Sequence, residues 1–220
     1  MLLWGCAMVG YHRPSLVSKA VNAVKGSLQK LSLRELGAMV WALATLGYNS
    51  QPVWEKLEAA AAKAPGTGTA EDAISLSMLA AGLALAQRRA LLPAMVKRAL
   101  ETSNGSLPTA ASSSLCQALG EAETPEPALW NELMRACVVH GKDRWKPAEA
   151  TRAVQGLVHA PASKEREALS GVLAAALVDL EAALAPHEVA MAHHALCALG
   201  VPGAVPYAAV EGAFAAALRD

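Results

Sequence analysis

The stretch "LGAMVWALATLGY", residues 36–48, decides how this chain is expected to fold. Its apolar residues recur every three to four positions, which is the spacing of one face of an α-helix. A similar helix signal appears directly after Met1 as "LLWGCAMVGYH" and near the other end as "ALCALG", residues 195–200. Repetition of one amphipathic helix indicates an array of similar units, so the period of the repetition is the first quantity to establish.

The period is close to 38 residues. With Leu43 as the reference position, six matching positions follow one another at spacings of 37, 39, 37, 38 and 39 residues. The position directly before the reference is glycine or alanine in every copy, which predicts a place where two helices touch backbone to backbone. The reference residues are Cys6, Leu43, Gly82, Leu119, Leu157 and Leu196.

Each copy has the start and stop signals of two helices. Ser32 and Glu35 form a capping box, Gly47 and Gly200 stand where a helix ends, and prolines such as Pro52 open the following helix. We name the first helix of each copy the A helix and the second the B helix. The A helices are expected near 1–10, 33–47, 70–86, 109–122, 147–160 and 187–200, and the B helices near 14–28, 52–64, 89–102, 125–139, 163–182 and 205–218.

Stacked helix pairs of this kind predict an all-α chain, a right-handed α-solenoid in which each repeat packs on its neighbours. A single array is expected over residues 1–220. The first copy lacks the front half of its A helix, from which we expect a piece of a longer array or a subunit with covered ends. The repeats are expected at about 1–30, 31–66, 69–104, 108–142, 146–183 and 186–220.

Composition agrees with helices and narrows the functional classes. Hydrophobic residues make up 54% of the chain and aromatic residues 4%, with abundant alanine, which favours helix. The formal net charge is zero, but residues 1–110 hold 11 basic and 6 acidic residues, whereas residues 111–220 hold 8 and 13. The basic half suits contact with a phosphate backbone. Chance placement of solvated charges, including Arg88, Arg89, Lys97 and Arg98, is the alternative.

Catalytic, metal and membrane signals are missing from the sequence. The four cysteines are far apart without a C-x-x-C pair, and no carboxylate or cysteine is seen to complete a ligand set with His187, His193 and His194. The longest apolar run is interrupted by Asp179 and Glu181, so no membrane span is predicted. No nucleophile and base arrangement or phosphate loop stands out. We therefore predict no enzyme, no cofactor and no metal site.

Residues 31–64, "LSLRELGAMVWALATLGYNSQPVWEKLEAAAAKA", resemble the octotricopeptide repeat, whose core reads roughly "L-x-L-L-W-A-L-A-x-L-G". "MVWALATLGY" matches best, "LLWGCAMVGY" is close and "HHALCALGVP" is recognisable, whereas copies three to five have lost the tryptophan. The resemblance implies an α-solenoid that binds single-stranded RNA in chloroplasts or mitochondria. Relatives act in the maturation, stability or translation of organellar transcripts, and some resemble accessory subunits of organellar ribosomes.

The A helices are expected to line the concave face of such a solenoid. The column of residues two positions before the reference reads Trp4, Trp41, Ala80, Gln117, Gln155 and His194. Tryptophan and histidine can stack on a base, glutamine can hydrogen-bond its edge, and arginine can meet a phosphate. Alternatively, the residues at these exposed positions vary because they have no binding role, and the two tryptophans cover the next repeat. The candidate RNA-binding residues are Trp4, Arg34, Trp41, Ser77, Gln117, Arg152, Gln155 and His194.

Two functions remain open at this point. The first is a helical-repeat protein that binds organellar RNA through A-helix side chains. The second is a structural scaffold in a large organellar complex such as a mitochondrial ribosome, with ribosomal RNA or other protein subunits as partners. A basic stripe along the A helices would favour RNA, and scattered basic residues would favour the scaffold.

Overall fold

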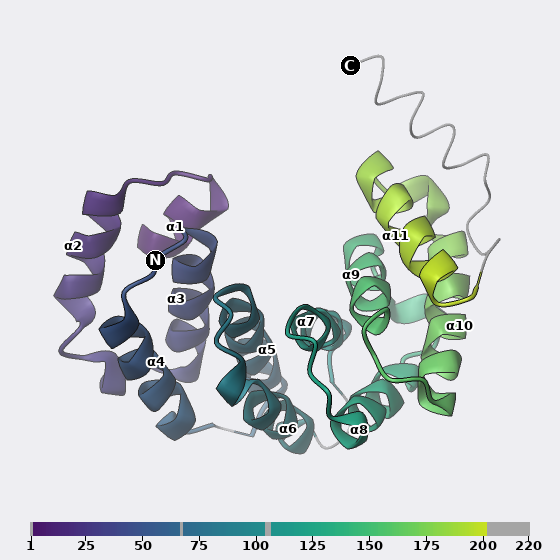
Figure 1. The fold of residues 1–220 in the computed structure, drawn as a ribbon, viewed down its shortest axis with the longest axis horizontal. Coiled ribbons are helices and arrows are strands. Elements are labelled where there is room, and N and C mark those ends of the chain that lie inside the picture. The colour runs from purple at the N-terminus through teal and green to yellow at the C-terminus, as the bar shows by residue number, and fades with distance from the viewer. Residues whose placement is uncertain (1, 67, 104–106, 202–220) are drawn as a thin grey trace, which may run out of the picture. The chain divides into compact units, whose positions relative to one another are not determined.

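The computed structural model describes residues 2–66, 68–103 and 107–201, and this part of the chain contains α-helices and short 3-10 turns but no β-strand. The expected all-α class is therefore confirmed. The chain divides into two compact units, unit 1 over Met1–Gly105 and unit 2 over Ser106–Asp220, which are described separately (Figure 1). A single continuous array across both units stays a prediction.

Unit 1 contains three A helices whose neighbours pack side by side, α1 against α3 and α3 against α5 (Figure 1). Each A helix is followed by a B helix and a connecting turn. The elements are α1 (Leu2–Met8), α2 (Pro14–Val24), η1 (Leu28–Lys30), α3 (Leu33–Thr45), α4 (Gln51–Lys63), α5 (Ala70–Leu85), η2 (Arg89–Leu91) and α6 (Leu92–Thr102).

Unit 2 has the same alternation, with α9 packed against both α7 and α11, and α10 against α8. The elements are α7 (Thr109–Glu121), α8 (Pro127–Val138), η3 (Lys142–Arg144), α9 (Pro147–Leu157), α10 (Lys164–Asp179), η4 (Glu181–Ala183) and α11 (Pro186–Ala198).

The observed helices agree with the expected ranges to within a few residues. The expected segment 89–102 is split into η2 and α6, because Pro93 opens a new helix at its first turn. The expected B helices 14–28 and 163–182 stop at Val24 and Asp179, and 3-10 turns follow. The last expected B helix, 205–218, lies outside the described residues.

Glycines allow the A helices to touch backbone to backbone. A Cβ atom on Gly82 of α5 would lie 2.7 Å from the backbone nitrogen of Trp41 on α3, and one on Gly37 would lie 2.7 Å from the carbonyl oxygen of Ser75. In unit 2, a Cβ atom on Gly156 of α9 would overlap the carbonyl of Cys116 on α7. The expected close contact is therefore present at Gly156 and, one residue after the expected Ala81, at Gly82. It is not present at Gly5, where a Cβ atom would meet nothing within 4 Å.

All the described A helices except α9 end alike. In α3 the amide of Gly47 donates to Ala44 and that of Tyr48 donates to Leu43, which is a Schellman motif with Gly47 in the left-handed conformation. The same pair of hydrogen bonds ends α1, α5, α7 and α11. The left-handed residues are Gly10, Gly47, Gln87, Glu123 and Gly200.

These ends correct the register of the third copy. The amide of Arg88 donates to Leu83, as that of Tyr48 does to Leu43, so Leu83 and not Gly82 stands at the reference position. The expected surface positions in this copy are therefore wrong by one residue. Ser77 and Ala80 are buried, and the surface positions are Ile74, Met78, Ala81 and Leu85.

Glutamates cap the N-termini of three A helices. Glu35 accepts from the backbone amide and hydroxyl of Ser32, both at 2.8 Å, and these bonds lower the pKa of its carboxyl. The expected capping box is thus confirmed. Glu149 and Glu188 accept in the same way from the amides of Lys146 and Ala185. Each glutamate lies in the first turn, where its charge also suits the helix dipole.

Long donors on the B helices satisfy the backbone of the preceding turns. The indole nitrogens of Trp54 and Trp130 donate to the carbonyls of Tyr48 and Thr124, at 2.8 and 3.0 Å. The guanidinium of Arg166 donates to Ala160 at 2.8 Å. In all three cases the donor lies six residues after the acceptor, so one geometric device recurs in both units.

Candidate functional site

The surface of the A helices is the candidate site, and its position follows from helix periodicity. Trp41 is half-buried, whereas its neighbours Val40 and Ala42 are fully buried. Gln117 and Gln155 have the same relation to their neighbours in unit 2. The residues two positions before the corrected reference therefore reach the surface in both units. We call them the outward column: Trp4, Trp41, Ala81, Gln117, Gln155 and His194.

The expected surface positions were placed correctly in five copies and wrongly in one, the third. Arg34 and His194 are exposed, and Trp4, Gln117, Arg152 and Gln155 are half-buried. Ser77 is only 3% exposed, and its hydroxyl donates to Ile74 within its own helix at 2.8 Å. Ser77 is therefore removed from the candidate set, because a ligand at the surface has no access to it.

In unit 1 the outward column begins with a pair of tryptophans. The ring centroids of Trp4 and Trp41 lie 4.6 Å apart, with an angle of 42° between the ring planes. Contact at this distance shields part of each ring from water and fixes both orientations. The remaining exposed ring surface is suited to stacking on a flat aromatic ligand.

An apolar pocket of about 370 Å³ lies beside this pair. Arg34 and Glu35 are the two charged residues among those that line it. Because the carboxylate of Glu35 is engaged with Ser32, Arg34 supplies the charge open to a ligand. The other lining residues are Leu2, Leu3, Trp4, Ala20, Val24, Leu31, Ala38 and Met39.

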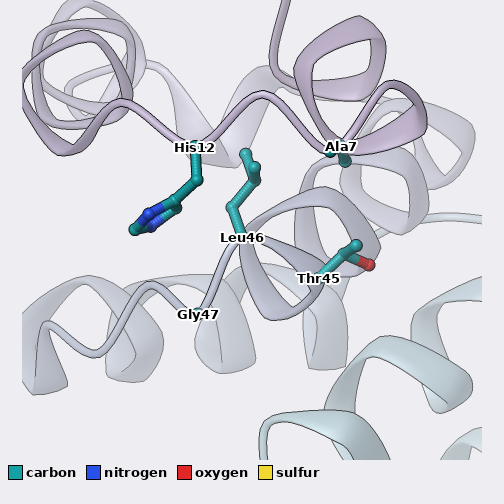
Figure 2. Close-up of a pocket in the computed structure, with 6 residues that line it drawn as sticks. Ala7, His12, Thr45, Leu46 and Gly47 are labelled. Atoms are coloured by element: carbon teal, nitrogen blue, oxygen red, sulfur yellow. The ribbon is translucent and has the colours of Figure 1, made fainter.

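A smaller pocket of about 280 Å³ lies where α1 and α3 end, between the turns after these helices. Figure 2 shows His12 and Leu46 directed into the space between the two turns, whereas Thr45 points away from it. The hydroxyl of Thr45 donates to the carbonyl of Trp41 at 2.9 Å, so it is occupied within its own helix. This pocket has little polar chemistry, and we give it no role in binding.

The outward column of unit 2 is polar. The amide of Gln117 donates to the carboxylate of Glu121 at 2.8 Å, which leaves its carbonyl oxygen as an acceptor for a ligand. The Nε of Arg152 donates to Ala148 at 3.1 Å, which holds the guanidinium on the surface of α9. Gln155 lies one turn further along the same face. Unit 2 therefore offers hydrogen-bonding groups where unit 1 offers aromatic rings.

Basic residues do not form a stripe along the A helices. Within the described ranges, Arg34 and Arg152 are the lysine or arginine residues on these helices. The guanidinium of Arg88 binds Gln51 and Glu58, both at 2.7 Å, and that of Arg98 binds the carbonyl of Ala64. Most of the basic excess of unit 1 therefore lies on B helices and connecting turns.

Comparison with protein-family models, with curated proteins and with solved structures found no match. The part of the chain that the structure describes has no helix long and apolar enough to cross a membrane. The same residues contain no group of three or more histidine, cysteine, aspartate or glutamate side chains placed to hold a metal ion.

Proposed function

We propose that this chain is a right-handed α-solenoid of about six helix-pair repeats, with a period near 38 residues, that binds single-stranded RNA through its A helices. The outward column carries the proposal. Its side chains lie at the surface while their neighbours form the core, and several of them are suited to bases: tryptophan and histidine for stacking, glutamine for hydrogen bonds. The resemblance to octotricopeptide repeats supports the same function in a mitochondrion or chloroplast.

The charge distribution specifies how this binding should work. Only Arg34 and Arg152 stand on the described A helices, so about two phosphate contacts are expected. For single strands, two such contacts give a slope of about −1.4 in a plot of log binding constant against log salt concentration. Stacking and base hydrogen bonds would then supply most of the free energy of binding.

The experiment is a fluorescence titration of labelled single-stranded RNA of mixed sequence at several salt concentrations. Trp41→Ala should weaken binding about tenfold, because stacking on one base contributes about 1–3 kcal/mol. The double variant Gln117→Ala/Gln155→Ala should weaken it comparably. The matched control is Lys19→Ala/Lys56→Ala, two exposed lysines on B helices. Loss of binding in the lysine control with none in the other variants would overturn the proposal.

A structural scaffold is the second candidate for two reasons. The basic residues are scattered and do not form a stripe along the described A helices. The corrected third copy also adds apolar residues to the A-helix surface of unit 1. Ile74 and Leu85 on α5 are 39% and 50% exposed, and Met8 on α1 is 61% exposed. Exposed apolar residues mark a protein contact where they form a contiguous patch, and these three lie on A helices of one unit. Sedimentation of the endogenous protein from organelle lysate decides between the two. Co-migration with a large particle that resists ribonuclease supports the scaffold, and a small complex that collapses with ribonuclease supports a transcript-binding factor.

A further inference from the structure

The last described A helix carries a histidine and a cysteine one turn apart. His193 and Cys197 are four residues apart on α11, which places them on one face of the helix. The Nε2 atom of His193 lies 3.6 Å from the Sγ atom of Cys197. Cys197 is exposed, whereas Cys6, Cys116 and Cys137 are buried.

The separation of the two atoms agrees with the geometry of a zinc site. Zinc binds a thiolate at about 2.3 Å and an imidazole at about 2.0–2.1 Å in a tetrahedron, which sets the two ligand atoms about 3.6 Å apart. One cation can therefore bind both side chains without a change in the helix backbone. A thiolate and an imidazole are also the ligands that zinc and cadmium prefer over oxygen donors.

We propose that His193 and Cys197 form a two-ligand site for a zinc-group cation, Zn²⁺ in the cell and Cd²⁺ as a laboratory probe. The Nε2 lone pair and the Sγ thiolate bind the cation, and the thiol proton passes to solvent. Water occupies the two remaining positions, so the cation stays open to a further ligand. This site does not depend on the proposed RNA function.

The test uses the full chain with reduced cysteines, first dialysed against a chelator. Cd²⁺ is titrated while the ultraviolet thiolate-to-cadmium absorption is recorded, and Zn²⁺ is then added as a competitor. We expect one Cd²⁺ per chain, release of about one proton per cation in an unbuffered solution at neutral pH, and tighter binding as the pH rises. Binding should also raise the melting temperature, because the cation bridges one turn of α11.

Variants separate this site from other thiols and histidines. His193→Ala and Cys197→Ser should each weaken Cd²⁺ binding by more than about tenfold, a loss that even supporting contacts cause at metal sites. Cys197→His should retain Zn²⁺ binding but lose the thiolate absorption. His187→Ala, which alters an exposed histidine in the first turn of α11, should bind as the native chain does. Melting curves without metal confirm that each variant is folded.

Two results would overturn the proposal. The first is an absence of Cd²⁺ and Zn²⁺ binding by the folded native chain, which would leave the pair as a hydrogen bond only. The second is unchanged binding in both His193→Ala and Cys197→Ser, which would place the cation on other side chains.

Discussion

Units 1 and 2 pack their A helices in the same way but present different surfaces. Gly82 brings α5 onto the backbone of α3 in unit 1, and Gly156 brings α9 onto that of α7 in unit 2. The outward column is aromatic in unit 1, with Trp4 and Trp41, and polar in unit 2, with Gln117 and Gln155. The contact between helices constrains the buried positions, and the surface positions are left free to differ.

The strongest test of this comparison adds one methyl group at each close contact. Gly82→Ala and Gly156→Ala should each destabilise the protein by about 3 kcal/mol, because the new Cβ meets backbone atoms that have no room to move. Urea unfolding measures the loss. If the two units unfold separately, each substitution should affect one transition alone.

Gly171→Ala is the control for these substitutions. Gly171 lies inside α10, and a Cβ there would meet nothing within 4 Å, so alanine should stabilise the helix by about 0.5–1 kcal/mol. Equal stability of Gly156→Ala and the native chain would show that the close contact between α7 and α9 does not exist in solution.

The next largest loss of stability is expected from removing the indole hydrogen bonds of the two units. Trp54→Phe in unit 1 and Trp130→Phe in unit 2 each remove the donor to a turn carbonyl, which should cost about 1–3 kcal/mol. Trp145→Phe is the matched control, because the buried Nε1 of Trp145 has no partner within the described chain. Thermal unfolding should therefore show a smaller loss for Trp145→Phe, and an equal loss in all three would contradict the role of the bond.

The ends of α5 and α7 allow a stabilising change. Gln87 and Glu123 adopt the left-handed conformation, with φ angles of 57° and 49°. The same position after α1, α3 and α11 is a glycine. Gln87→Gly and Glu123→Gly should each stabilise the protein by about 1 kcal/mol, because glycine has no steric cost there. Gly47→Ala is the opposite change and should destabilise it. Melting temperatures that move in the reverse sense would refute this account of the helix ends.

The smallest expected change in stability is a pH effect that arises in unit 2. His140 contacts Trp145 edge to face, and burial is the main cause that lowers its pKa below the ordinary value of 6.5. The neighbouring charges oppose each other, since Arg144 lowers the pKa and Glu149 raises it. The folded state thus resists protonation. Its full stability should be present above pH 6.5 and should decrease as the pH falls below that value.

His140→Asn should remove part of this pH dependence, because asparagine keeps a polar group at the position but does not titrate. The measurement is the free energy of unfolding in urea between pH 5 and 8. An unchanged slope in the variant would assign the effect to other groups.

The helix positions were predictable because their signals are local. Capping residues such as Ser32, prolines such as Pro52 and the apolar period all act within one helix, and the structure agrees with them. The register of the third copy was not predictable from the same evidence. Ala81 and Gly82 are both small, so either could stand at the helix contact. The end of α5 is set by Gln87, and glutamine is not a residue type that predicts a left-handed conformation.

The candidate surface was predictable in position but not in detail. Helix periodicity placed Trp41, Gln117 and Gln155 at the surface, since it depends only on the buried neighbours. The ring contact between Trp4 and Trp41 and the engagement of Arg88 and Arg98 depend on distances between helices, which a single sequence does not contain. The four-residue spacing of His193 and Cys197 is visible in the sequence, whereas the 3.6 Å separation of Nε2 and Sγ is not.

The glycine contacts also limit how each unit can move. A slip of about one turn along the helix axis, about 5.4 Å, would bring a side chain to the place that Gly82 or Gly156 now occupies. These close contacts therefore oppose sliding of the A helices past one another within each unit. A B helix and its connecting turn can rotate relative to the packed A helices without such a slip. If either unit adapts its shape to a partner, we expect hydrogen exchange to be fastest in the B helices and slowest in α3 and α9.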